Sequence, residues 1–171
     1  MNHTIADSAA LVEPMAAAKS IDFIVDLLEE DESIQTDATK LRQMLVNLLS
    51  NGIKFTENGE VRVSCLVNNG ILELRIADTG VGISAENIEE VFEPFWQAEQ
   101  TATRKTGGTG LGLSVTRKLA RLLGGDVTVA SKLGTGTTFL LTLPMKAPAG
   151  EPVRRRDTPT TPTSAVPAFR G

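Results

Sequence analysis

The chain has 171 residues, a net charge of −4 and 41% hydrophobic residues, which suit one folded domain with an apolar core. The acidic balance argues against a nucleic-acid-binding protein, which usually presents a basic face. No apolar run approaches the roughly 20 residues of a membrane helix, and no signal-peptide pattern is present, so we expect a cytoplasmic segment without membrane contact. The lone cysteine, Cys65, excludes an internal disulfide, and its alternating apolar surroundings predict a buried thiol.

The first half of the chain alternates between helical and strand-like spacing. In chain order, its patterns predict a helix over 5–19, a strand over 20–28, a helix over 37–55, and strands over 61–65 and 72–76. The helix over 37–55 has the clearest pattern, with leucines at helical spacing and Asp37 as its N-terminal cap. The last two strands flank an Asn-Asn-Gly turn and predict an antiparallel hairpin.

The second half predicts a short helix over 84–91, a loop over 97–109, a helix over 110–123 and a hairpin of strands over 126–130 and 136–143. Paired strands with helices between them indicate an α+β fold, a two-layer sandwich whose mixed sheet carries helices on one face. From residue 147 the composition shifts to Pro, Thr, Ala and Arg, which predicts a folded domain over 1–146 and a disordered tail over 147–171.

The first motif with chemical potential lies on the predicted helix over 37–55. Asn47 and Asn51 are four positions apart and share one helical face. Amide oxygens can ligate a Mg²⁺ ion that is bound to phosphates, and Lys54 is near enough to contact a phosphate. Considered alone, an ordinary amphipathic helix with surface asparagines is the simpler explanation.

The second motif, Asp78-Thr-Gly-Val-Gly-Ile, directly follows a predicted strand. Gly80 and Gly82 allow a tight turn and a close approach to a ligand. The Asp78 carboxylate can accept a hydrogen bond from an exocyclic amine such as that of adenine, although a plain turn begun by aspartate is the alternative. Residues 92–96, Phe-Glu-Pro-Phe-Trp, then predict an apolar hinge or simple core packing.

The third feature is a glycine-rich string over 107–113 that opens the predicted helix over 110–123. Backbone amides at a helix N-terminus form an anion site, although similar strings occur in many turns. The string lacks the Lys-Ser/Thr ending of a Walker loop. It also does not follow a first strand with an acidic residue about 20 positions later, so a dinucleotide-binding fold is not indicated.

Together and in this order, these segments resemble the N, G1, F and G2 boxes of the sensor histidine kinases, which belong to the GHKL ATPase superfamily with gyrase. The resemblance spans residues 8–145, with a lead-in to the N box over 36–45 and a final glycine motif over 134–139. It implies the Bergerat (GHKL) ATPase fold, with ATP and Mg²⁺ as cofactors. Gly52 stands where the family usually has alanine.

The resemblance implies a role for each matching residue. Asn51 would ligate Mg²⁺ with Asn47 assisting as a second metal-binding residue, Lys54 would contact a phosphate, and Asp78 would bind the adenine amine. Residues 97–109 match the ATP lid of the family. The remaining positions implied to bind the nucleotide are Phe55, Gly80, Gly82, Ile83, Arg104, Lys105, Gly108, Thr109, Gly110, Leu111, Gly112 and Thr137.

The chain departs from a whole kinase of this kind at its only histidine, His3, which lacks the acidic neighbour of the acceptor site. We therefore expect a monomer that lacks the acceptor hairpin. It would donate the γ-phosphoryl group of ATP to a histidine on a separate dimerisation domain, upstream of a response regulator. Asn47 stands where hydrolysing relatives carry a glutamate base, so we expect slow hydrolysis.

Three alternatives remain open at this point. The chain could be a nucleotide-binding regulatory module without transfer activity, or a serine-directed protein kinase of the same superfamily. It could also be an interaction domain whose boxes are vestigial, which the intact Asn51 and Asp78 argue against. Adding an acceptor domain in trans would separate a kinase from a module that only binds the nucleotide.

Overall fold

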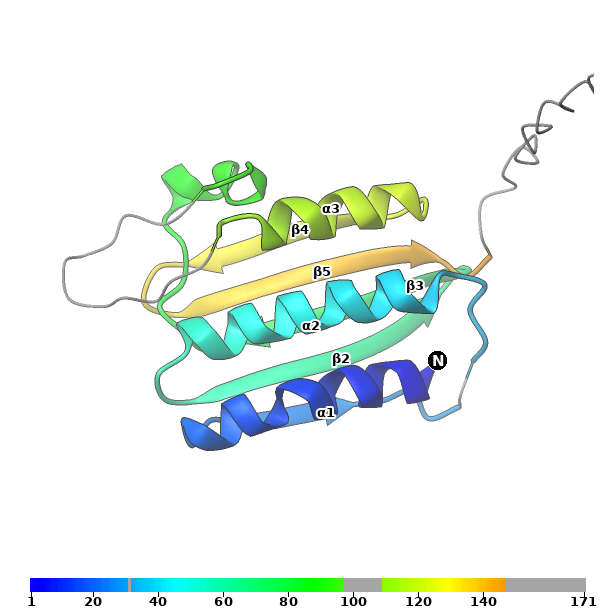
Figure 1. Ribbon diagram of the computed structural model, residues 1–171, viewed down its shortest axis with the longest axis horizontal. Helices are drawn as coiled ribbons and strands as arrows, with labels where there is room; N and C mark the ends of the chain where they lie inside the picture. The colour runs from blue at the N-terminus through cyan, green and yellow to red at the C-terminus, as the bar shows by residue number, and fades with distance from the viewer. Residues whose placement is uncertain (31, 97–108, 147–171) are drawn as a thin grey trace, which may run out of the picture.

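The computed structural model describes residues 1–30, 32–96 and 109–146 of the chain. Within them, three α-helices cover one face of a five-stranded sheet (Figure 1). The elements are α1 (Asn2–Ala18), β1 (Asp22–Asp26), α2 (Ala38–Phe55), β2 (Glu60–Asn68), β3 (Ile71–Asp78), α3 (Gly112–Leu122), β4 (Asp126–Lys132) and β5 (Gly136–Pro144). The predicted two-layer α+β fold is confirmed.

The sheet is mixed, as predicted, with the strand order β1-β2-β3-β5-β4. Edge strand β1 runs parallel to β2, and all other neighbours are antiparallel. Both predicted hairpins form, as β2–β3 and β4–β5. Because β5 pairs with β3, the second hairpin continues the sheet of the first. This pairing places the end of β3 beside the start of β5, with Asp78 opposite Thr137.

Helix α2 lies over the centre of the sheet and supplies much of the core. Its apolar stripe is fully buried, as its helical spacing predicts, through Leu41, Met44, Leu45, Leu48 and Leu49. Asp37 caps the helix as predicted, since its Oδ1 accepts a hydrogen bond of 3.0 Å from the Lys40 amide. A contact between the Asp37 carboxylate and the Lys40 ammonium lowers the pKa of Asp37.

The prediction of a short helix over 84–91 is wrong. The segment forms two 3₁₀ turns, Ala85–Asn87 and Glu90–Phe92. Val91 is the only residue of the two turns that is buried, so the segment lacks the repeated apolar positions with which an α-helix packs against a core.

The prediction of a buried Cys65 is also wrong, because its side chain is half-buried. Strand β1 ends at Asp26, which pairs with Ser64, so β1 stops before it can cover Cys65. The thiol approaches the Asp26 carbonyl oxygen at 3.4 Å. Partial burial raises the pKa of this thiol.

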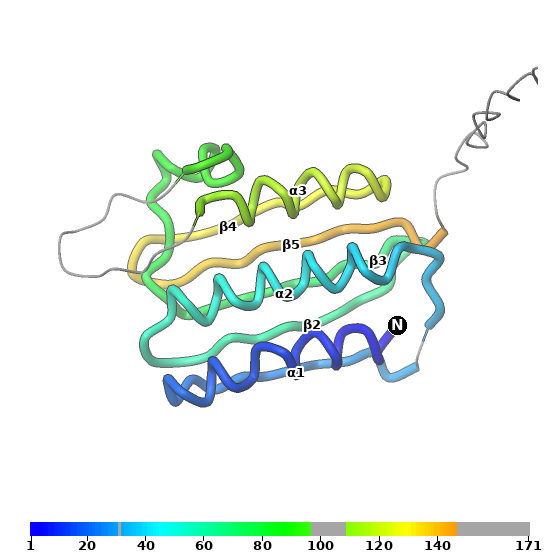
Figure 2. Tube along the Cα trace, viewed as in Figure 1, coloured from blue at the N-terminus to red at the C-terminus, as the bar shows by residue number. Residues whose placement is uncertain are grey.

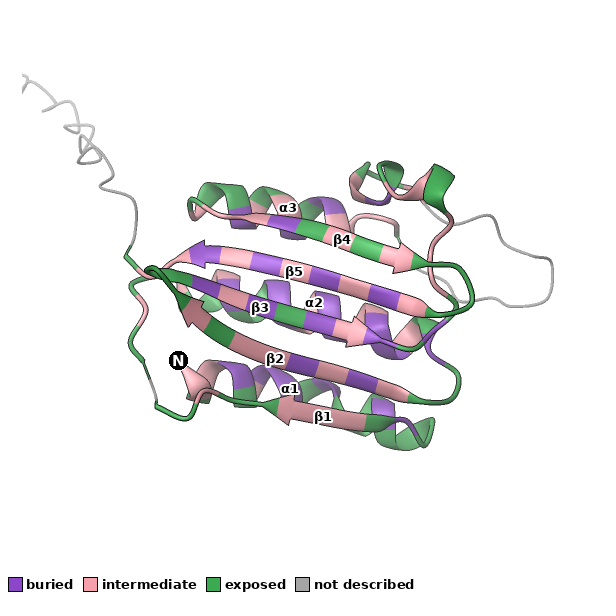
Figure 3. Ribbon diagram, turned by 180° about the vertical axis from the view of Figure 1, so that it is seen from behind, coloured by how far each residue is buried: buried purple, intermediate pink, exposed green. Residues whose placement is uncertain are grey.

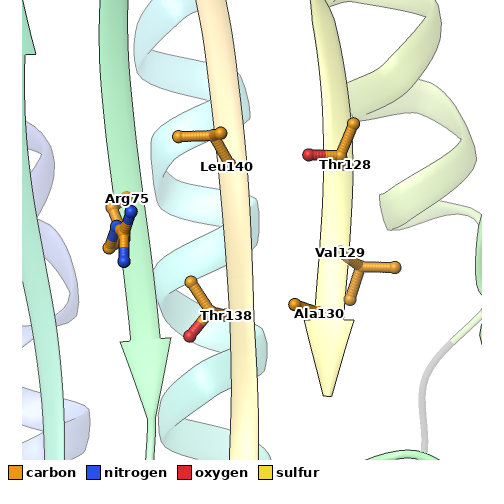
Figure 4. A pocket seen from close by; sticks show the side chains of 6 residues that line it. All are labelled: Arg75, Thr128, Val129, Ala130, Thr138 and Leu140. Carbon is orange, nitrogen blue, oxygen red and sulfur yellow. The ribbon is translucent and has the colours of Figure 1, made fainter.

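The second face of the sheet carries no helix among the described residues (Figure 3). It has a shallow depression lined by Arg75, Thr128, Val129, Ala130, Thr138 and Leu140 (Figure 4). Asp78 and Thr137 are buried beneath the helices, so this depression is separate from the predicted nucleotide site. No helix in the described parts of the chain has the length and apolar character needed to cross a bilayer.

Candidate nucleotide-binding site

The predicted site residues that the structure describes gather at one end of the sandwich, where α2 and β3 end, α3 begins and β4 turns into β5 (Figure 2). The strand register places one residue from each of four strands in a row across the helix-covered face at this end. That row is Val61, Asp78, Thr137 and Ser131. Segments separated by up to 76 positions therefore contribute side chains to one surface.

Asp78 is the acidic centre of this row, and its side chain is only 9% exposed. Its Oδ1 accepts hydrogen bonds from the backbone amides of Gly80, at 2.9 Å, and Thr137, at 3.2 Å. Burial raises the pKa of Asp78, and the two amide hydrogen bonds offset part of that effect. No buried side-chain oxygen or nitrogen of the described residues lacks a partner. The second oxygen of Asp78 therefore reaches solvent and can accept a further hydrogen bond.

Gly80 and Gly82 both lie where a side chain would collide with backbone. A Cβ atom at Gly80 would come within 2.4 Å of the Phe55 carbonyl oxygen, and one at Gly82 within 2.1 Å of the Lys132 carbonyl oxygen. Gly82 also has a positive φ of 69°. The two glycines thus let the loop after β3 pack directly against the end of α2 and the β4–β5 turn.

Ser131 belongs to this site, although its motif context gave no sign of it. Its Oγ accepts a hydrogen bond of 2.8 Å from the Ile83 amide and lies 2.9 Å from the Thr137 hydroxyl. Ser131 thereby connects the loop after β3 with strand β5, where Thr137 lies beside Asp78. Only the pairing of β4 with β5 reveals this role, since one shifted register would turn Ser131 to the open face.

The two asparagines of α2 have different surroundings. The Asn47 amide donates a 2.7 Å hydrogen bond to the Thr116 hydroxyl, which in turn donates to the Gly112 carbonyl oxygen. Gly112 fits so closely that a Cβ there would lie 2.3 Å from Asn47 Oδ1. Asn47 therefore joins α2 to the first turn of α3. Asn51, one turn later, has no side-chain hydrogen bond within the described residues and is partly exposed.

Lys54 and Phe55 lie at the end of α2. The Lys54 ammonium is 4.9 Å from the centre of the Phe55 ring, within range of a cation–π contact. The Phe55 side chain is 41% exposed, which leaves much of its ring available to a ligand. A cation and an aromatic face thus border the loop that follows Asp78.

The N-terminus of α3 borders the same end of the molecule. The helix begins at Gly112 after Leu111, and no side chain caps its first amides. Its approach is fixed by Gly110, which has a φ of 67° and whose carbonyl oxygen accepts a hydrogen bond from the Phe95 amide. Thr109 is the first described residue after the gap. Uncapped amides of this kind bind anions.

The aromatic segment over 92–96 has two different environments. Phe92 packs edge-to-face against Phe139, with ring centres 6.3 Å apart, and Arg117 Cζ lies over the Phe92 ring at 4.6 Å from its centre. Phe95 is 71% exposed and has a positive φ of 66°. Core packing therefore holds for Phe92 alone. Sequence reasoning did not identify Arg117, which also pairs with Asp126.

Three residues expected to contact the phosphates, Arg104, Lys105 and Gly108, lie outside the described residues, as does most of the predicted lid over 97–109. In the described parts of the chain, no group of three His, Cys, Asp or Glu side chains could hold a metal ion. A Mg²⁺ ion at this site would need ligands of another kind, such as amide and phosphate oxygens.

Residues 36–147 match the family described as histidine kinase-, DNA gyrase B- and HSP90-like ATPase. The chain belongs to this family. The match runs from the lead-in of α2 to the end of β5 and includes each segment that forms the site. Its ATPase domain is of the histidine kinase type, as the relatives show.

Two sensor proteins illustrate the similarity. The chain is 41% identical over 143 residues to the autoinducer 2 sensor kinase/phosphatase LuxQ of Vibrio parahaemolyticus, an alignment that covers 80% of the chain and 17% of LuxQ. It is 38% identical over 142 residues to the aerobic respiration control sensor protein ArcB of Escherichia coli, an alignment that covers 81% of the chain and 18% of ArcB. The chain thus spans less than a fifth of these relatives.

Solved structures agree with the sequence comparison. Full-length ShkA in complex with AMPPNP superposes with a TM-score of 0.76 at 31% identity, over 87% of this chain and 31% of ShkA. The catalytic domain of the histidine kinase ThkA superposes with a TM-score of 0.73 at 28% identity, over 85% of this chain and 94% of that domain. The chain therefore corresponds to the catalytic domain of a histidine kinase.

Proposed function

We propose that the chain binds Mg-ATP at the end of the sandwich centred on Asp78 and donates the γ-phosphoryl group to a histidine on a separate dimerisation domain. The observation that carries this proposal is the buried Asp78 carboxylate, which has one oxygen held by two backbone amides and the other open to solvent. A fixed, open acceptor at the bottom of a glycine-shaped loop suits an exocyclic amine.

Recognition of adenine would depend on the row around Asp78. The open oxygen would accept from the adenine amine, while Thr137 and Gly80 hold the carboxylate in one orientation. The exposed part of Phe55 offers an apolar surface for the base. Guanine carries an oxygen where adenine carries the amine, so the same carboxylate would repel it. We therefore expect selectivity for adenine nucleotides.

The phosphates would lie toward α2 and α3. Asn51 is free to present its amide oxygen to Mg²⁺, which when bound would neutralise phosphate charge and orient the γ-phosphoryl group. Lys54 and the backbone amides of Gly110, Leu111 and Gly112, which lead into the uncapped start of α3, would contact phosphate oxygens. We propose the same role for Arg104, Lys105, Gly108 and Thr109 from their place in the matching motif.

Asn47 would act mainly on protein atoms. Its amide already donates to Thr116, so it would hold the start of α3 against α2. A neutral amide cannot accept a proton from water as a general base. Phosphoryl transfer to a protein histidine, with slow hydrolysis, is therefore the reaction that this position favours.

The same proposal implies partner domains and a cellular location for the chain. The relatives are much longer sensor proteins, so we propose that the folded domain over 1–146 works with an acceptor domain and a response regulator in the cytoplasm. We expect the isolated chain to be monomeric, without a nucleic-acid or membrane partner; the tail predicted over 147–171 lies outside the described residues.

Isothermal titration with AMPPNP, with and without Mg²⁺, tests the binding step. We expect wild type to bind, and Asp78→Asn to lose at least about tenfold in affinity because an amide presents a donor to the adenine amine. GTP should bind more weakly than ATP. Equal affinity of wild type and Asp78→Asn would contradict the placement of adenine.

A complemented assay tests the transfer step. The chain is mixed with radiolabelled ATP and a purified histidine-bearing dimerisation domain, and acid-labile phosphate on that domain is measured. We expect Asn51→Ala to abolish Mg-dependent transfer and the exposed control Asn68→Ala to leave it unchanged. Binding without transfer would favour a regulatory module, while acid-stable phosphate on serine would favour the serine-directed kinase.

A further inference from the structure

The C-terminus of α2 is held by a lysine at the end of another helix. Lys19 follows directly after α1, and its Nζ donates hydrogen bonds of 2.8 Å to the carbonyl oxygens of Ile53, Lys54 and Thr56. An ammonium has three protons, so this set uses every one. A cation at a helix C-terminus also interacts favourably with the partial negative charge of the last carbonyls.

The other carbonyls of the last turn of α2 are also engaged. Gly52 accepts from the amide and the hydroxyl of Thr56, and Phe55 accepts from the amide of Val81 at 3.2 Å. The four carbonyls that an α-helix leaves unpaired at its end are thus all satisfied. Lys19 supplies two of the four, and the loop after Asp78 supplies one.

The backbone is strained at the residue that follows Lys19. Ser20 has a φ of +55°, the left-handed conformation that usually requires glycine. The amide of the buried Ile21 bonds back to the Ala16 carbonyl oxygen at 3.0 Å. This left-handed end reverses the chain immediately after Lys19. The Lys19 side chain is itself exposed, so its hydrogen bonds and not its packing hold it in place.

The turn that Lys19 holds, the last turn of α2, borders the candidate site. Phe55 and Lys54 lie on it, and Asn51 lies one turn before its end. The Phe55 carbonyl oxygen bonds to the Val81 amide and closely approaches Gly80, so a shift of this turn would move the loop that presents Asp78. The helix end and the carboxylate loop form one connected unit.

We propose that Lys19 is a positioning residue for the nucleotide site: it fixes the last turn of α2 and, through the Phe55–Val81 hydrogen bond, the loop after Asp78. The functional part of this inference rests on the proposed function. The described hydrogen bonds of the Lys19 ammonium all go to backbone carbonyl oxygens at the end of α2, so Lys19 acts through the backbone of this helix.

Lys40 offers a matched control on the same helix. It pairs with Asp37 at the N-terminus of α2, at the opposite end from Lys19. Lys40→Met and Lys19→Met remove the same charge and keep an unbranched side chain, so both test the effect of losing one cationic contact on α2. Lys19→Arg keeps the cation and several donors and serves as the rescue variant.

Hydrogen exchange on the full chain without nucleotide measures the positioning directly. We expect Lys19→Met to raise the exchange rates of the Thr56 and Val81 amides at least about fivefold, because the turn that holds both is loosened. Amides in β4 and β5 should keep their wild-type rates. Wild-type rates at Thr56 and Val81, or an equal increase throughout the chain, would overturn the proposal.

Titration with AMPPNP and Mg²⁺, well below the unfolding temperature, measures the consequence. We expect about tenfold weaker binding for Lys19→Met, wild-type affinity for Lys40→Met, and recovery of most of the affinity with Lys19→Arg. Unchanged affinity in Lys19→Met, or an equal loss in Lys40→Met, would overturn the functional role. If wild type itself does not bind, the proposed function fails, while the exchange measurement still decides whether Lys19 positions the turn.

Discussion

The two ends of α2 are stabilised in different ways. At the N-terminus, Asp37 caps the Lys40 amide within a single turn of the chain. At the C-terminus, three of the last four carbonyls accept from Lys19, which follows α1, and from Val81 in the loop after β3, more than 25 positions away in each direction. The local end carries no predicted site residue, whereas the long-range end carries Asn51, Lys54 and Phe55.

This difference shows how the fold creates a rigid site. A local cap can form as soon as its helix forms, and it fixes nothing beyond the first turn. The long-range end forms only when α1, α2 and the loop after β3 have assembled, and it then holds three segments in one arrangement. Substitutions at the C-terminal end should therefore affect stability and nucleotide binding together, and those at the N-terminal end stability alone.

The largest expected effect follows from Gly80→Ala. Its Cβ would lie 2.4 Å from the Phe55 carbonyl oxygen and 2.9 Å from Asp78 Oδ1. Backbone must move to relieve the first contact, so we expect a loss of about 2–3 kcal/mol in the free energy of unfolding. The loop that presents Asp78 moves with it, so binding of AMPPNP should fall below detection. Urea unfolding and calorimetry measure the two effects.

Gly70→Ala is the control for that substitution. Gly70 has a φ of +74° in the β2–β3 turn, and a Cβ there would meet no atom within 4 Å. The substitution should cost about 1 kcal/mol through its backbone conformation and leave the affinity for AMPPNP unchanged. A Gly80→Ala variant that is no less stable than Gly70→Ala would disprove close packing at the C-terminal end.

The next effect concerns the N-terminal end alone. Asp37→Ala removes the cap of α2 and should lower the free energy of unfolding by about 1 kcal/mol. The affinity for AMPPNP should stay at the wild-type value, since no site residue lies on the first turn. A parallel loss of affinity would mean that the two ends of the helix are not independent. Thermal unfolding followed by titration at a lower temperature separates the two quantities.

The same contrast explains how much of the molecule the sequence predicts. The helical spacing of Leu41 to Leu49, the Asp37 cap and the two hairpins depend on neighbours in the chain, and the structure confirms them. The helix over 84–91 was wrong because two 3₁₀ turns with little burial replace it. The predicted burial of Cys65 was wrong because it depends on the length of β1. The sequence of β2 does not show where its short parallel neighbour ends.

The site divides along the same line. Asp78, Gly80 and Thr137 come together as their motifs predict, since each motif has a fixed sequence signature. Ser131 and Lys19 have none, because both act across register or helix packing that the sequence does not display. Asn47 was expected beside the metal, and its hydrogen bond to Thr116 shows a partner that only the packing of α2 on α3 could supply.

A further effect tests the strain behind Lys19. Ser20→Gly keeps the left-handed end of α1 and removes the cost of its Cβ, so the free energy of unfolding should rise by about 0.5–1 kcal/mol. Affinity for AMPPNP should not fall, because Lys19 keeps its position. A loss of stability in urea unfolding would indicate that the flexibility of glycine in the unfolded chain outweighs the strain.

The smallest effect is expected from Gly52→Ala, inside α2 at its long-range end. Glycine within a helix costs about 1 kcal/mol relative to alanine. The new Cβ would lie 3.3 Å from Val61 Cγ1 and 3.6 Å from Asp78 Cβ, and the first contact is tight enough to offset part of the gain. We expect a net increase of about 0.5 kcal/mol in the free energy of unfolding and less than about a threefold change in affinity. A loss of stability would show that the Val61 side chain cannot move away from the new Cβ. A large change in affinity would show that the space beside Asp78 is part of the adenine pocket, and that glycine is needed there for ligand binding.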